Sequence, residues 1–214
     1  EDGVTCPASA TFADDAPLVA IVFYRSFLVA ADLAPIEALF TALRARGFRA
    51  LGLFAPSLKA PGAREWLERQ VRALAPVAIV NATSFSGRGD AGRSPLDAAD
   101  VPVFQVALST ATRDAWDGSD RGLSPADLAL PGVLPVADAR LFPGVAPFTA
   151  PGARDPHLQF SRFAHAPEPA RIDAIADRVV AWHGLSTKPP AQRRLALVLS
   201  TYPGRAWNMA HAVG

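Results

Sequence analysis

Three glycines are spaced as in a phosphate-binding loop. Gly87, Gly89 and Gly92 satisfy the pattern G-x-G-x-x-G and follow an apolar run that is typical of a strand. Backbone N–H groups of such a loop bind phosphate when a helix begins directly after it. Here the segment 94–100 has room for only a single helical turn, and Arg93 stands where a P-loop has lysine. We therefore predict a glycine-rich surface loop that binds no nucleotide.

Polar residues also follow two of the predicted strands at the point where each strand ends. Arg25 and Ser26 follow the first strand, and Asn81, Thr83 and Ser84 end or follow the third. The carboxyl ends of parallel strands share one edge of a sheet, where α/β folds bind ligands. We expect these residues to lie together there as a substrate-binding set. Arg25 is either an anion clamp, since a guanidinium suits carboxylates, or a solvated strand end.

Two more groups could belong to this edge. Asn81 and Thr83, with Gln105 on the next strand, need hydrogen-bond partners if they are buried, so they either tie the loops together or face a polar ligand. Three further binding candidates follow a later apolar run in a Tyr-Pro-Gly-Arg turn and just after it: Tyr202, Arg205 and His211. A turn after a strand is a usual place for functional groups, so these residues are expected to join the edge if their segment docks there.

Composition narrows the classes of function. A net charge of +1, from 21 basic and 20 acidic residues, predicts no binding to nucleic acid or to an anionic membrane. The single cysteine, Cys6, excludes an internal disulfide and suits the cytoplasm. The four histidines lack the spacing of zinc ligands, so no metal site is predicted. Because the chain opens without methionine and stops within a motif, we expect a piece of a longer protein.

The elements that must position these residues alternate between strand and helix. Continuous apolar runs predict buried strands at 18–23, 48–54, 77–80 and 103–108. Between the first three runs lie two helical patterns, which Pro35 and Pro61 open. This alternation predicts an α/β fold with a parallel, flavodoxin-like, doubly wound sheet, followed by the start of a second α/β segment.

The predicted domain organisation has four parts. They are an irregular lead-in at 1–16, a flavodoxin-like domain at 17–185, a linker at 186–193 and the beginning of a following α/β domain at 194–214. Within the large domain, recurrent proline and glycine predict an irregular region at 110–167, with short strands near 133–136 and 140–148. A helix is predicted at 169–182, and a further buried strand at 194–201.

Seven stretches together resemble the large subunit of aerobic cobaltochelatase and, more distantly, the H subunit of magnesium chelatase. They are VAIVFYRSFL (19–28), APIEALFTALRARGF (34–48), LFAPSLKAP (53–61), IVNATSFS (79–86), SPLDAADVPVFQVAL (94–108), RDAWDGSDRGLSPADLAL (113–130) and RRLALVLSTYPGRAWNMAHAVG (193–214). They occur in the family's order and run nearly the whole chain. The closing stretch resembles the cobalt branch.

The resemblance implies a cytoplasmic subunit that binds hydrogenobyrinic acid a,c-diamide while Co²⁺ is inserted as a substrate. ATP and Mg²⁺ would be used by a separate AAA+ partner subunit, and a further small subunit would complete the complex. The chain departs from the family at Phe27, where many relatives have histidine, and at PVADAR (135–140). Family members are several times longer than this chain, so we expect the catalytic residues to lie beyond Gly214. Two other readings remain: a non-catalytic scaffold region of a magnesium-chelatase-type H subunit, and a small-ligand-binding α/β domain.

Overall fold

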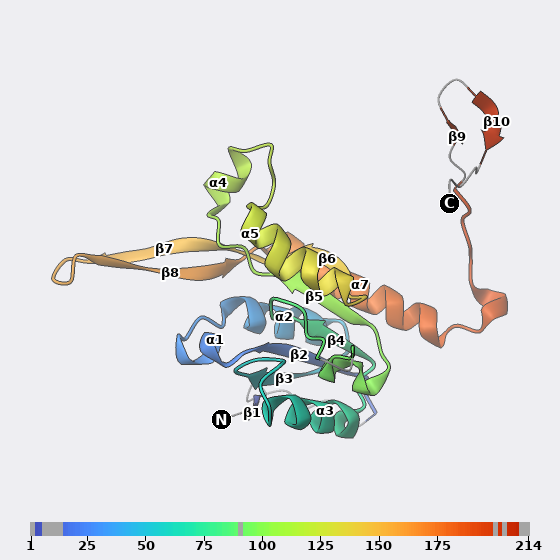
Figure 1. Ribbon diagram of the computed structural model, residues 1–214, viewed down its shortest axis with the longest axis horizontal. Coiled ribbons are helices and arrows are strands. Elements are labelled where there is room, and N and C mark those ends of the chain that lie inside the picture. Colours follow the sequence, from blue (N-terminus) through green and yellow to red (C-terminus); the bar gives the residue numbers. More distant parts are fainter. Residues whose placement is uncertain (1–2, 6–14, 90–91, 199–200, 203–204, 210–214) are drawn as a thin grey trace. The chain divides into compact units, whose positions relative to one another are not determined.

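A mostly parallel sheet organises the first of two compact units, Glu1–His183 and Gly184–Gly214 (Figure 1). The structure is a computed structural model that describes residues 3–5, 15–89, 92–198, 201–202 and 205–209. In this described part, the sheet has six strands in the order β1-β3-β2-β4-β5-β6. Their bounds are β1 Gly3–Thr5, β2 Leu18–Tyr24, β3 Arg49–Ala55, β4 Ala78–Asn81, β5 Val103–Ala107 and β6 Leu141–Val145.

The strand order confirms the flavodoxin-like prediction. Strands β2 to β6 are parallel to one another, and their order β3-β2-β4-β5-β6 is that of a doubly wound sheet. Strand β1 pairs antiparallel with β3 at the edge, within a stretch that the sequence pattern left as an irregular lead-in.

Helices cover both faces of the sheet. The central strand β2 is therefore buried on both faces, which explains why its residues are apolar throughout. Val19, Ile21 and Phe23 pack on one face with α2 and α7, whereas Ala20 and Val22 pack on the other with α3 and η1. The bounds are α2 Ala34–Ala45, α3 Ala63–Leu74, η1 Pro95–Ala99 and α7 Pro169–Thr187. A strand buried on both faces needs apolar residues at every position, and each buried aliphatic side chain contributes about 1.5–3 kcal/mol.

The helix boundaries follow the predicted signals. Pro35 lies in the first turn of α2, and Gly47 just after the helix adopts a φ of +85°, which glycine tolerates best. The single turn predicted after the glycine loop is confirmed as η1. Ser94 caps it by accepting a hydrogen bond from the N–H of Leu96 at 3.3 Å.

The region 110–167, expected to be irregular, contains regular elements. They are α4 Arg113–Asp117, α5 Pro125–Leu128, the π-turn η2 Ala129–Val133, α6 Leu134–Ala137, β6, β7 Pro147–Asp155 and β8 Phe160–Pro167. The strand predicted at 133–136 is wrong, because Ser124 and Pro125 start a helix that runs through this stretch. The strand predicted at 140–148 is confirmed by β6 and the start of β7.

Strands β7 and β8 form an antiparallel hairpin whose outer half is exposed (Figure 1). Its inner half is tied to the loop before α2. The Nδ1 atom of His165 lies 2.6 Å from a carboxylate oxygen of Asp32, and the backbone N–H of His165 donates to the other oxygen at 2.9 Å. Both side chains are largely buried, so this pair fixes the base of the hairpin.

The second unit contains the end of α7, the short helix η3 Pro190–Gln192 and a small antiparallel pair, β9 Thr201–Tyr202 and β10 Arg205–Met209. The strand predicted at 194–201 is wrong over its described part, 194–198, where no strand is formed and Leu195 is 94% exposed. An apolar run becomes a strand only where a neighbouring strand pairs with it, and the described residues supply none there. A following α/β domain stays a prediction.

No helix within the described ranges is long and apolar enough to cross a membrane.

Candidate functional site

A small pocket opens at the carboxyl edge of the sheet, beside the ends of β2, β3 and β4. Its volume is about 220 Å³, and it is lined by Tyr24, Ser57, Leu58, Lys59, Ser84, Phe85 and Ser86. The lining combines hydroxyl groups, one ammonium group and two aromatic rings. Such a mixture can bind a carboxylate or amide group attached to a larger apolar body.

Tyr24 and Ser84 connect the ends of β2 and β4. The topological switch point of the sheet lies between these two strands. The hydroxyl of Tyr24 donates to the carbonyl oxygen of Ser84 at 2.6 Å and accepts from its N–H at 3.2 Å. Burial raises the pKa of the Tyr24 hydroxyl, an effect that its hydrogen bond to Ser84 opposes. The crevice typical of this fold is therefore bridged between β2 and β4, and the open space lies beside the bridge.

Phe85 holds an unusual backbone conformation at the pocket. Its φ is +68°, in the left-handed region that bulky residues avoid, and its side chain is half-exposed. Its N–H donates to the carbonyl of Leu130 at 2.8 Å, which fixes the residue against the helical segment 125–137. A strained residue that presents an aromatic ring to solvent is a recurring feature of ligand sites.

The glycine loop binds a carboxylate of the protein itself, that of Asp138. The carboxylate of Asp138 accepts a hydrogen bond from the N–H of Gly87 at 2.7 Å and from the hydroxyl of Ser86 at 2.8 Å. Gly87 also packs closely, because an added Cβ would lie 2.7 Å from the hydroxyl of Ser94. The guanidinium of Arg64 holds the far end of the loop by donating to the carbonyl of Arg93 at 2.6 Å. Gly87 therefore has a role in packing within the protein.

Asn81, Thr83 and Gln105 form a buried network. The Asn81 amide donates to Gln105 Oε1 at 2.7 Å, the Gln105 amide donates to the Thr83 carbonyl at 2.6 Å, and the Thr83 hydroxyl donates to Asn81 Oδ1 at 2.9 Å. All three side chains are buried. Of the two alternatives that the sequence left open, the geometry favours tying the loop to the sheet. Ligand contact by Asn81 or Thr83 stays a prediction.

Arg25 and Ser26 begin α1, Arg25–Val29, directly after β2. Because Val22 of β2 pairs with Asn81 of β4, Arg25 and Asn81 lie at the same edge of the sheet, as predicted. Ser26 is exposed and Arg25 is partly exposed. Phe27 places its ring 5.7 Å from that of His165, edge to face.

The remaining predicted residues belong to the second unit, Gly184–Gly214, and their place at this edge stays a prediction. Tyr202 and Arg205 pair with each other in the β9–β10 ladder of the second unit. His211 lies outside the described residues. Within those residues, no group of three or more His, Cys, Asp and Glu side chains is arranged to hold a metal ion.

Sequence reasoning missed several residues that line the pocket: Tyr24, Ser57, Lys59 and Phe85. Ser57 and Lys59 could have been found, because they follow β3 at the same edge, and Lys59 is conspicuous in a chain whose basic residues are nearly all arginine. The exposed ring of Phe85 could not have been found, because its orientation depends on a contact with residue 130.

The fold and this edge define an α/β domain of the doubly wound class with a polar and aromatic pocket at its strand ends. The family model for CobN/Magnesium Chelatase matches residues 4–214. The chain belongs to this family, which confirms the resemblance seen in the sequence.

The chain is similar to named proteins of both the cobaltochelatase and the magnesium-chelatase branch of the family. The chain is 35% identical to the aerobic cobaltochelatase subunit CobN of Sinorhizobium sp over 92% of this chain and 16% of that protein. It is 34% identical to the subunit of the same name from Pseudomonas aeruginosa, with the same shares covered. With the magnesium-chelatase H subunit of Rhodobacter capsulatus it shares 28% identity over 88% of this chain and 17% of that protein.

A solved structure of the same family has a similar fold. The catalytic subunit of cobaltochelatase from Mycobacterium tuberculosis matches with a TM-score of 0.74 and 28% sequence identity, over 94% of this chain and 17% of that one. The chain thus spans about a sixth of the length of these relatives.

Proposed function

We propose that this chain is part of the corrinoid-binding large subunit of an ATP-dependent cobaltochelatase, which inserts Co²⁺ into hydrogenobyrinic acid a,c-diamide. Membership of the family supports the proposal, and the cobalt branch is favoured over the magnesium branch by identities of 34–35% against 27–28%. The observation that carries the role of this domain is the pocket at the carboxyl edge, with Lys59, Ser84 and Phe85 in its lining.

The size of the pocket limits what it binds. Pockets that enclose a drug-sized ligand have volumes of about 300–1,000 Å³, and a corrinoid ring is larger than such ligands. A pocket of about 220 Å³ therefore accepts one peripheral acid or amide arm of the macrocycle and not the ring itself. Lys59 and the serine hydroxyls would bind that arm, and Phe85 would contact the adjoining edge of the ring.

Arg25 and Ser26 extend the binding edge beyond the pocket. They follow β2 directly after Tyr24, which lines the pocket, so a second carboxylate of the corrinoid would meet them. Asn81 and Thr83 would position the loop that carries Ser84. Tyr202, Arg205 and His211 would contribute if the second unit docks against the ring.

Metal insertion needs bases that remove two pyrrolic protons and groups that deliver the cation. We assign those catalytic groups to other parts of the subunit. Co²⁺ is a substrate in this scheme, and ATP with Mg²⁺ is used by an AAA+ partner subunit, with a further small subunit in the complex. The setting is the cytoplasm, with no nucleic acid or membrane as partner.

A titration of the chain with the corrinoid, and separately with ATP, tests the proposal. We expect corrinoid binding that weakens when Lys59 is replaced by alanine, and no ATP binding. Binding of ATP would favour a small-ligand domain. The same titrations are made with a polypeptide of the full length of the relatives, and its Lys59→Ala variant serves as the comparison. If neither this chain nor the longer polypeptide binds either ligand, the result favours a scaffold region.

A further inference from the structure

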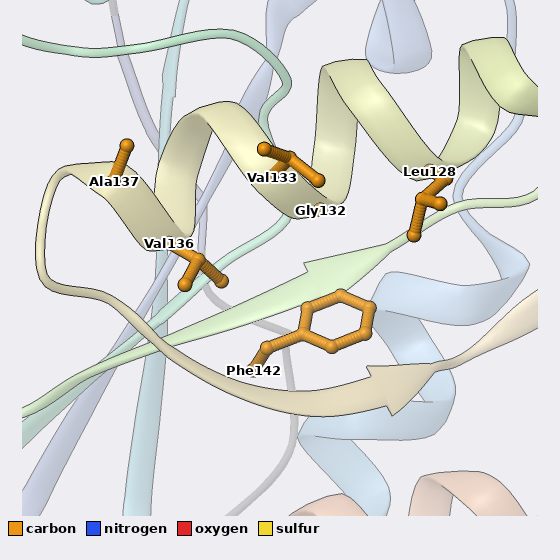
Figure 2. Close-up of a pocket in the computed structure, with 6 residues that line it drawn as sticks. All are labelled: Leu128, Gly132, Val133, Val136, Ala137 and Phe142. Atoms are coloured by element: carbon orange, nitrogen blue, oxygen red, sulfur yellow. The ribbon is translucent and has the colours of Figure 1, made fainter. Parts of the chain in front are cut away.

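An apolar groove lies along the helical segment 125–137. It has a volume of about 390 Å³ and lies between this segment and strand β6 (Figure 2). Its lining consists of Leu128, Gly132, Val133, Val136, Ala137 and Phe142. None of these residues carries a charge or a polar side chain, so the groove suits an apolar occupant.

The groove is exposed although its lining is aliphatic. Leu128 is 49% exposed, Val133 54% and Val136 45%. Clustered exposed aliphatic residues mark contact surfaces, because isolated domains do not gain by leaving them in water. The π-turn η2 contributes Gly132 and Val133 to the groove, and such turns are frequent at functional sites.

We infer that the groove is covered by an apolar helix or loop from another part of the same polypeptide. In the relatives, the matching region makes up only 16–17% of the chain, so most of the polypeptide lies outside it. A segment of that remainder is tethered to the domain and so meets the groove at an effective concentration of about millimolar or more.

The size of the groove argues against a second copy or an untethered partner. A stable complex of separate proteins buries roughly 800 Å² on each side. A groove bordered by three exposed aliphatic side chains provides only a small part of that area. Tethering removes this requirement, since the docked segment does not have to bind from free solution.

The occupant inserts side chains and does not add a strand. Strand β6 is the edge of the sheet in the described part of the chain, but it contains Pro143, which has no N–H to donate. Gly144 next to it has a φ of +142°, which departs from regular strand geometry. A blunted edge of this kind is a poor template for another strand.

Hydrogen–deuterium exchange of residues 125–145 tests the inference. The isolated 214-residue chain is compared with a polypeptide that carries it at the full length of the relatives. We expect exchange in this segment to be about tenfold slower in the long form, because docking suppresses local opening. Val136→Asp in the long form should remove the difference. Val29→Asp, which changes an exposed valine of α1, should leave it intact.

The inference is independent of corrinoid binding, and the alternatives give other outcomes. Equal exchange in both forms, or protection that survives Val136→Asp, overturns it. Protection of the isolated chain that grows with concentration would mean a second copy, and protection that needs an added polypeptide would mean a separate partner; both also overturn it. The isolated Val136→Asp chain should keep its melting temperature within about 2 °C, since the replaced side chain is half-exposed.

Discussion

The carboxylate of Asp138 accepts a hydrogen bond from the backbone N–H of Gly87 at 2.7 Å, where a phosphate-binding loop would present that N–H to its ligand. The two residues are 51 positions apart, and the contact joins the glycine loop to the end of the helical segment 125–137. A loop whose sequence resembles a phosphate cradle is thus occupied by an internal anion.

The first prediction is that the chain binds no nucleotide and hydrolyses no ATP. The Gly87 N–H is taken by Asp138, and the loop leads into one turn of helix instead of a long one. Calorimetric titration should give no binding heat at ATP concentrations up to about 1 mM, where an affinity of about −4 kcal/mol would be detected. ATP binding that disappears on Arg93→Ala would contradict this.

The second prediction concerns Asp138 itself. Asp138→Asn should lower the free energy of unfolding by about 1–3 kcal/mol, because a buried hydrogen-bonding charge is lost from Ser86 and Gly87. Urea denaturation measures the effect. The matched variant Asp120→Asn changes an exposed residue and should stay within about 0.5 kcal/mol of the unchanged protein. Equal stability of the two variants would show that the Asp138 contacts contribute little.

The third prediction uses the pH dependence of Tyr24. Burial raises its pKa above the ordinary value of about 10, so the folded state disfavours the phenolate. The resulting stability is fully present below pH ~10 and is lost as the pH rises through the raised pKa. Tyr24→Phe should cost about 0.5–1.5 kcal/mol at neutral pH and should flatten the loss of stability above pH ~10. An unchanged alkaline slope in urea unfolding would contradict it.

The fourth prediction separates positioning from ligand contact. Asn81→Ala should destabilise the fold by about 1–3 kcal/mol, because Gln105 and Thr83 lose buried hydrogen-bond partners. Ser26→Ala, at the same edge but exposed, should leave stability unchanged. Thermal unfolding of both variants distinguishes the roles. A fully stable Asn81→Ala protein would mean that the network does not hold the edge together.

The sheet was predictable from the sequence because its signals are local. The run of β2 is apolar at every position, and proline and glycine mark the ends of α2, so pattern and periodicity locate these elements. The helix at 133–136 was not predictable in the same way. Pro131 and Pro135 favour a break in the helical segment 125–137, and the wide turn η2, which contains Pro131, joins α5 to α6 without one.

The candidate site was predictable as an edge but not as a set of contacts. Topology alone places Arg25 and Asn81 together, since parallel strands share their carboxyl ends. The occupation of the glycine loop by Asp138 and the position of Phe85 depend on contacts with the segment 125–138, which the sequence pattern left irregular. Contacts over such separations leave no periodic signal.

The affinity of the Arg25→Ala variant for hydrogenobyrinic acid a,c-diamide tests most directly whether the carboxyl edge of this sheet binds the corrinoid. The measurement uses a polypeptide of the full length of the relatives, with Arg69→Ala on the outer surface of α3 as the matched control. We predict a loss of about 1.5–3 kcal/mol for Arg25→Ala, or roughly 10- to 150-fold in Kd, and none for the control. Unchanged corrinoid affinity in a well-folded Arg25→Ala protein would contradict the account.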